Sequence, residues 1–288
     1  IGLFIIIAWG ANDATVKLKR RKVILGSVSL LIICVLSVCT FFQTNCWRNS
    51  KTLFEHALKV TKQNHLACNK VAYSLMEEGK YDEAVKLIRQ GLQIRPLYVE
   101  AFNNLGFSYT KLERWPEAVE AYKQAIKIRP GFANAHYNLG VAYFHLGQTE
   151  QALESFKYAI KSMPDYADAY FYLGLTHLSL DNLQEAIKDF EQVVKIRPTD
   201  TDAYNNLGTT YIRLGRNNEA IEVLRQAVGI KPDFVEANYN LGVALLMAGD
   251  RNSAVRQYEI LRKLNLAKAE ILLNIMQGNG EGPTLPHR

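Results

Sequence analysis

The side chains that most often carry out catalysis are scattered through this chain of 288 residues. Its six histidines form no HExxH motif or other paired spacing of metal ligands, and its four cysteines form no CxxC motif. The sequence also lacks GxxxxGK, GxSxG and a glycine-rich loop that follows a strand. We therefore predict no catalytic residue, no metal site and no cofactor within this chain.

Asparagine is the polar residue whose spacing is regular. Asn104, Asn138, Asn206 and Asn240 each precede a Leu-Gly pair, whereas Tyr172 takes the intervening place. An amide side chain both donates and accepts hydrogen bonds, so a row of amides can bind a peptide backbone without reading its sequence. The alternative is that each amide satisfies a neighbouring backbone group.

These asparagines belong to a repeat of 34 residues. The same register is kept by Gly106, Gly140, Gly174, Gly208 and Gly242, by Pro96, Pro130, Pro164, Pro198 and Pro232, and by two series of alanines. A fixed period of this size is typical of a solenoid. It predicts six units at residues 65–98, 99–132, 133–166, 167–200, 201–234 and 235–268.

Each unit is expected to form two short helices. In residues 201–234 the apolar side chains follow helical spacing up to Tyr211, and Gly215 then suits a left-handed helix end. Pro232 follows the second helix, which cannot easily continue through it. Small residues such as Gly208 allow the paired helices to approach closely. We therefore predict an all-α solenoid.

The repeated pattern resembles the tetratricopeptide repeat, with an aromatic residue, Asn, Leu and Gly followed by Tyr, Ala and Pro at fixed distances. The resemblance implies a right-handed superhelix of helix pairs. Glu113 and Asp181 depart from the pattern because they replace the helix-ending glycine. His136 and His177 lie at places that are aromatic in other units, which favours a packing role for both.

The solvent side of each first helix is expected to line a concave binding surface. Helical geometry puts the second, fifth, ninth, twelfth and thirteenth places of each unit opposite the buried side, with the sixth at the edge. The predicted contacts are Asn103, Asn104, Lys111, Tyr137, Asn138, Asp168, Phe171, Asp202, Asn205, Asn206, Arg213, Glu236, Tyr239 and Asn240. Such mixed rows suit an extended peptide. The alternative is that the rings pack between units and the charges form a solvated face.

The N-terminal part is apolar in a different way. Residues 23–42 contain no charge, and at ~1.5 Å per helical residue they can span a hydrocarbon core of ~30 Å. We predict a transmembrane helix, since a cleaved signal peptide has an apolar region of only about 7–15 residues. Residues 1–9 are too short to span a bilayer. We expect them to be the end of a membrane helix that begins upstream of this sequence.

The net charge of +6 bears on topology and on partners. Residues 65–268 hold 24 basic and 24 acidic side chains, so the excess lies outside the repeats. Neutral repeats argue against a nucleic-acid partner. The loop at 10–22 is basic near residues 17–22 and is expected on the cytoplasmic side of the membrane. The repeats are then extracytoplasmic, in a periplasm or lumen, and cytoplasmic repeats are the alternative.

The two ends of the repeat array also follow its register. Residues 47–64 match a second helix and predict a half repeat beside the membrane segment. Residues 267–277 predict an extra helix that caps the last unit, and residues 278–288 are expected to be disordered. The sequence leaves open whether Cys46 and Cys68 form a disulfide.

The order of elements suggests a larger parent protein. IGLFIIIAWG, a basic loop, a membrane helix and CWRNSKTLFEHALKVTKQNHLA before the repeats resemble the C-terminal part of C-type membrane glycosyltransferases, including the transmembrane-and-repeat protein O-mannosyltransferases. This resemblance implies that the repeats present acceptor polypeptides to an upstream active site, whose acidic residue has no counterpart here. The alternative is a scaffold in a cell-envelope assembly. In either case we predict a membrane-anchored module that binds a protein or an extended peptide.

Overall fold

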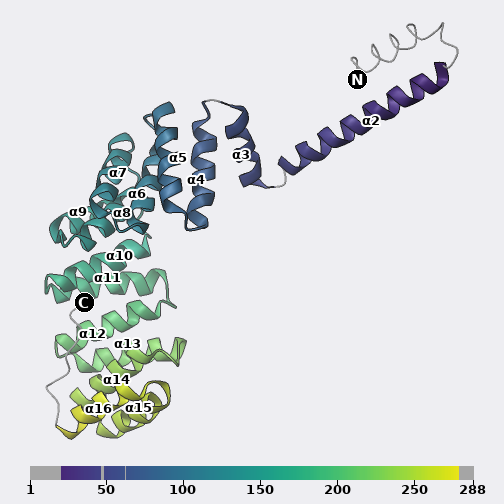
Figure 1. Cartoon of the computed structure of the whole chain (residues 1–288). Coiled ribbons are helices and arrows are strands. Elements are labelled where there is room, and N and C mark those ends of the chain that lie inside the picture. Colours follow the sequence, from purple (N-terminus) through teal and green to yellow (C-terminus); the bar gives the residue numbers. More distant parts are fainter. Residues whose placement is uncertain (1–20, 47–48, 62, 279–288) are drawn as a thin grey trace. The chain divides into compact units, whose positions relative to one another are not determined.

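The computed structural model describes residues 21–46, 49–61 and 63–278 of this chain (Figure 1). The described part is helical and contains no strand. The all-α fold predicted from the repeats is therefore confirmed. The chain divides into two compact units, residues 1–95 and 96–288. The predicted membrane-helix end at 1–9, most of the basic loop at 10–22 and the tail after residue 278 lie outside the described residues.

The first unit contains α2 (Arg21–Cys46), α3 (Ser50–Val60), α4 (His65–Glu77) and α5 (Tyr81–Ile94). The stretch predicted to cross a membrane lies within α2, which is 26 residues long. In the part of the chain that the structure describes, no helix has both the length and the apolar character needed to cross a membrane.

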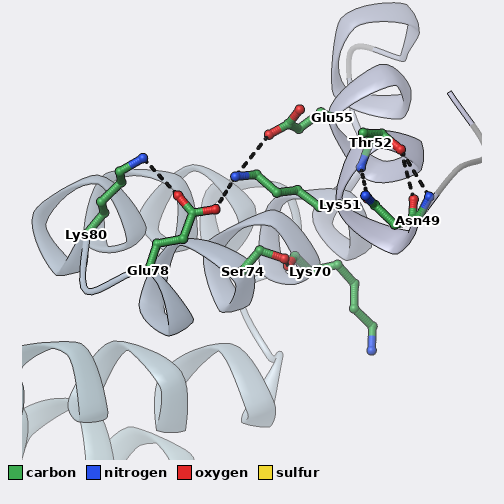
Figure 2. Close-up of polar contacts among 8 residues, drawn as sticks. All are labelled: Asn49, Lys51, Thr52, Glu55, Lys70, Ser74, Glu78 and Lys80. Carbon is green, nitrogen blue, oxygen red and sulfur yellow. Dashed lines mark hydrogen bonds and ion pairs between the residues drawn. The ribbon is translucent and has the colours of Figure 1, made fainter. Parts of the chain in front are cut away.

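Polar contacts fix α3 against the helix that follows it (Figure 2). At its start, the Asn49 side chain accepts a hydrogen bond from the Thr52 backbone N–H at 2.9 Å, and Thr52 Oγ1 accepts one from the Asn49 backbone N–H at 3.3 Å. Lys51 of α3 forms an ion pair with Glu78 after α4, and Lys80 Nζ donates to the same carboxylate at 2.8 Å. The bonds from Lys51 and Lys80 lower the pKa of Glu78 to about 2. Helix α3 thus packs directly on the first helix pair.

The second unit is a stack of helix pairs followed by one further helix (Figure 1). The first helices of the pairs are α6 (Val99–Lys111), α8 (Ala133–His145), α10 (Ala167–Ser179), α12 (Thr201–Arg213) and α14 (Val235–Met247). The second helices are α7 (Trp115–Ile128), α9 (Thr149–Ser162), α11 (Leu183–Ile196), α13 (Asn217–Ile230) and α15 (Arg251–Leu264), and α16 (Leu266–Gln277) follows. Helix α16 packs against both α14 and α15.

Glycine at the eighth place of a unit brings the two helices of a pair into contact. A Cβ atom on Gly140 would lie 2.6 Å from Cε1 of Phe156, whose side chain is fully buried. A Cβ on Gly208 would lie 2.5 Å from Cγ of Leu224. The prediction that these glycines permit close helix packing is confirmed. In the last unit the contact of Gly242 comes from Leu272 of α16, so α16 completes the core there.

The turn between the two helices of a pair requires a left-handed backbone. Gly147 and Gly215 adopt φ angles of 69° and 71°, and the non-glycine residues Glu113 and Asp181 adopt 57° and 58°. These two residues replace the glycine of the repeat pattern, yet their backbone adopts the same left-handed conformation as the glycines. A side chain makes this conformation costly because Cβ approaches a carbonyl oxygen.

We expect Glu113→Gly to raise the free energy of unfolding by roughly 0.5–1 kcal/mol, because relief of the left-handed strain exceeds the entropy that glycine adds to the unfolded chain. Urea denaturation followed by circular dichroism measures the change. Gly147→Ala is the matched control, and it should lower stability by about 1 kcal/mol, since its Cβ meets no atom within 4 Å and only the backbone is strained. A loss of stability in Glu113→Gly would contradict the strain argument.

Candidate functional site

The first helices of the helix pairs in residues 96–288 lie on the inner side of the stack. Helix α6 contacts α8, α8 contacts α10, α12 contacts α14, and α14 contacts α16. Each second helix packs instead against the first helix of its own pair and the first helix of the following pair. In the last pair, α15 packs against α14 and α16. The solvent side of the first helices therefore forms the inner face of the stack, which we call the concave face.

Asparagines of successive units contact each other across the concave face. Asn138 Nδ2 donates to Asn103 Oδ1 at 3.2 Å, and Asn240 Nδ2 donates to Asn205 Oδ1 at 2.8 Å. In both cases the sixth residue of one unit meets the fifth residue of the unit before. These bonds use the amide oxygen of the fifth residue and leave the Nδ2 groups of Asn103 and Asn205, both half-buried, as donors toward the groove.

In the middle of the concave face, rings replace this pair of amides. Tyr137 is the fifth residue of its unit and Tyr172 the sixth of the next, and their ring centroids lie 5.8 Å apart at 73°. Tyr166 lies 5.0 Å from Tyr137 on another side. Phe171, also a fifth residue, contacts Phe190 at 5.8 Å. These rings pack on their neighbours and remain partly exposed.

Burial shifts the acid–base properties of the tyrosines. It raises the pKa of Tyr166 to about 12 and raises the pKa values of Tyr137 and Tyr172 as well, with a smaller contribution from the nearby Asp168 carboxylate in each case. All three hydroxyls are therefore protonated at neutral pH, so each can donate a hydrogen bond.

The charged residues predicted for the groove differ in their partners. Asp168 forms an ion pair with Arg197, and Arg213 Nη2 contacts Asp181 Oδ1 at 2.6 Å. The Lys111 ammonium lies 5.4 Å from the centroid of the Phe107 ring. Three other predicted residues also lie on first helices. Asp202 and Glu236 are exposed, and Asn104 is half-buried.

The C-terminal end of the predicted row is less accessible. Tyr239 and Asn240 are buried, and the Lys268 ammonium of α16 lies 4.9 Å from the Tyr239 ring centroid. Asn206 is half-buried and donates from Nδ2 to the Asp202 carbonyl at 2.9 Å.

His136 and His177 serve the packing of the helices. His136 Nε2 lies 2.8 Å from the Pro130 carbonyl oxygen, and Asn238 makes the equivalent bond to Pro232 at 3.0 Å in the last unit. His177 Nδ1 lies 2.6 Å from Asp189 Oδ2 in the interior. Among the described residues no cluster of His, Cys, Asp and Glu can hold a metal ion.

The sequence left open whether Cys46 and Cys68 form a disulfide. Cys68 is a buried free thiol, and burial raises its pKa. The side chain of Cys46 lies outside the described part of the chain. In the structure Cys68 is unpaired.

The pairing of the sixth residue with the preceding fifth residue was not found from the sequence. Its signal is a spacing of 35 residues between two Asn or two Tyr side chains, one more than the repeat length. A search for identical residues at the repeat length alone does not reveal it.

Protein-family comparisons agree with this architecture. A family described as TPR repeat matches residues 72–113, 108–147 and 208–249, and two families described as tetratricopeptide repeat match residues 137–201 and 177–228. The matches run together without a gap from residue 72 to residue 249. The chain belongs to the tetratricopeptide repeat family.

Two solved structures share the fold of this chain over part of its length. A crystal structure of MamA is 28% identical and covers 56% of this chain and 95% of its own, with a TM-score of 0.54. YrrB, described as a TPR protein with an unusual peptide-binding site, is 24% identical and covers 64% of this chain and 95% of its own, with a TM-score of 0.56.

One curated relative of the tetratricopeptide repeat chain is the human Protein O-mannosyl-transferase TMTC3. It is 30% identical over 96 residues, which is 33% of this chain and 10% of the relative. The match therefore spans a tenth of the relative's length.

Proposed function

We propose that this tetratricopeptide repeat chain is a membrane-anchored module that binds an extended peptide along its concave face. The observation that carries the proposal is the pair of amides formed between successive units at Asn103 and Asn138 and again at Asn205 and Asn240. In each pair the amide oxygen of the fifth residue is already engaged, and its Nδ2 group is left to donate to a peptide carbonyl. Such donors bind main chain and so tolerate many sequences.

If these donors bind peptide, Asn103→Ala combined with Asn205→Ala should weaken peptide binding about tenfold, since each substitution removes one hydrogen bond of about 0.5–1.5 kcal/mol. The readout is fluorescence polarisation with a labelled peptide selected from a random library. Asn218→Ala is the matched control, because Asn218 is exposed at the start of α13, on a second helix. Unchanged affinity in the double variant, with normal stability, would rule out this role of the amides.

We further propose that α2 anchors the module in a membrane. Most of its described apolar side chains are exposed, among them Leu30, Leu31, Ile33, Val38 and Phe41. Covering exposed apolar surface of this kind with lipid removes it from water and lowers the free energy. The basic residues at 17–22 favour a cytoplasmic position for the preceding loop, which puts the repeats on the opposite side.

A topology reporter fused after Arg288 tests the orientation. We expect alkaline phosphatase activity, which requires an extracytoplasmic location, and no activity from a cytoplasmic reporter at the same site. The reverse result would place the repeats in the cytoplasm. Release of the protein by alkaline carbonate would contradict integral membrane anchoring itself.

The partial match to TMTC3 supports a role beside glycosyl transfer. In this role the repeats present acceptor polypeptides to a glycosyltransferase region of a larger protein. A glycosylation assay on membranes that carry the whole protein tests it, with the Asn103→Ala and Asn205→Ala variant as comparison. Transfer that is unaffected by that variant would favour a scaffold in a cell-envelope assembly.

A further inference from the structure

The middle of the concave face carries three tyrosines that we name the tyrosine cluster: Tyr137 of α8, Tyr166 before α10 and Tyr172 of α10. Tyr137 lies at the centre, with ring centroids 5.0 Å from Tyr166 and 5.8 Å from Tyr172. Each ring is half-buried, and no hydrogen bond from any of the three hydroxyls is found among the described residues. The cluster therefore offers ring surface and free donors together.

The rings of the tyrosine cluster pack against the rings of three phenylalanines. Phe156 is fully buried, and its ring centroid lies 5.9 Å from that of Tyr172 and 6.2 Å from that of Tyr137. Phe144 and Phe171 flank Tyr172 at 5.9 Å and 6.1 Å. Because the rings are already packed, a ligand that lies on them orders few side chains, which lowers the entropic cost of binding.

The local charge is balanced at the tyrosine cluster. Asp168 is the nearby carboxylate that acts on all three hydroxyls, and it is ion-paired with Arg197. The cluster thus has no net charge that demands an ionic ligand. It supplies apolar ring faces and protonated hydroxyls, and the Nδ2 group of Asn103 adds a donor one unit earlier along the same face.

A polyproline II segment matches this combination of rings and donors. Proline has no N–H, so a proline-rich backbone presents carbonyl acceptors and needs no acceptor in return. Polyproline II has no internal hydrogen bonds, and aromatic-lined grooves are a general means of binding it.

The spacing also matches. Polyproline II advances about 9 Å per turn of three residues, and neighbouring packed helices lie about 8–10 Å apart. One turn of ligand therefore corresponds to one repeat. A proline on Tyr137 would be followed three residues later by one near Phe171, the equivalent fifth residue of the next unit.

We propose that the tyrosine cluster binds a proline-rich segment of a partner polypeptide in the polyproline II conformation, with proline rings on Tyr137 and Phe171 and backbone carbonyls bound by the tyrosine hydroxyls. This inference rests on the proposed peptide-binding function and names the class of its ligand.

The test uses the full chain in detergent and a fluorescein-labelled peptide of nine prolines, compared with a labelled alanine-glutamine peptide of equal length. We expect the proline peptide to bind at least about tenfold more tightly. Tyr137→Phe combined with Tyr172→Phe keeps the rings and removes two hydroxyls, and should weaken its binding about tenfold. Tyr170→Phe on the same helix is the control and should leave binding unchanged, since Tyr170 packs against the buried residues Ala167, Val193 and Ala203.

The outcomes separate this inference from the proposed function. Equal affinity for the two peptides, or no loss in the double variant, overturns the proline assignment. If peptides from a random library still bind and depend on Asn103 and Asn205, the peptide-binding function stands without it. If neither the proline peptide nor any library peptide binds, both proposals fall.

Discussion

Gly140→Ala is expected to lower the free energy of unfolding by about 2–3 kcal/mol. The new Cβ would lie 2.6 Å from Cε1 and 2.7 Å from Cδ1 of Phe156, a separation that real Cβ atoms essentially never show. Phe156 is fully buried and lies under the tyrosine cluster, so its ring cannot move without disturbing both helices of the pair. Overpacking of this kind costs about 1–3 kcal/mol and occasionally more, and it outweighs the helix propensity that alanine adds.

Gly229→Ala provides a control of opposite sign. Gly229 lies in α13, has an ordinary helical φ, and a Cβ there would meet no atom within 4 Å. Alanine should therefore stabilise the protein by roughly 0.5–1 kcal/mol through helix propensity alone. Urea denaturation of the two variants in parallel measures both effects. A Gly140→Ala variant as stable as Gly229→Ala would show that the helix pair can separate at little cost.

The repeat period predicted most of the fold because its signals are local. Gly140 and Gly208 recur at one place of each unit, and the contacts that require them lie within a single helix pair. Glu113 shows the strength of this register, since its backbone adopts the turn conformation although the residue is not glycine. The last repeat departs from this register. The side chain that packs on its Gly242 is Leu272 of α16, whereas Gly140 and Gly208 are contacted by the second helix of their own pair.

The candidate site was only partly predictable, because its contacts join different units. Helical geometry places Asn103 and Asn138 near the groove, but the hydrogen bond between them depends on how two first helices pack. The same holds for Tyr137, whose neighbour Tyr172 comes from the next unit. Tyr239 has the same place in its unit and is nevertheless buried, since α16 follows it instead of a full repeat.

The interior hydrogen-bonded pair His177–Asp189, in the third helix pair of residues 96–288, is the other feature with a large expected effect. His177 of α10 and Asp189 of α11 are both buried, and His177 Nδ1 lies 2.6 Å from Asp189 Oδ2. Other units place Tyr143, Tyr211 or Leu245 where His177 stands, so an apolar side chain fits that place. We expect His177→Leu to lower stability at pH 7 by about 3 kcal/mol, because it leaves a buried carboxylate without its partner.

Replacing both partners should recover most of that loss. His177→Leu combined with Asp189→Val removes the charge together with its partner, and exchange of a buried pair for apolar residues is often close to neutral. We expect the double variant to lie within about 1 kcal/mol of the original protein by urea denaturation. A double variant as unstable as the single one would mean that packing volume, and not the unpaired carboxylate, causes the loss.

The pH dependence of the single variant separates the same two causes. Burial already raises the pKa of Asp189, and the hydrogen bond from His177 opposes this rise. Without His177 the pKa of the folded carboxyl rises further above its unfolded value of about 3.9, so the folded state binds the proton more tightly than the unfolded state does. Stability then falls as the pH increases from about 4 up to the folded pKa, and the deficit is complete above it. We therefore expect the gap between His177→Leu and the double variant to be large at pH 7 and to shrink as the pH approaches 4, whereas a packing defect would give the same gap at both.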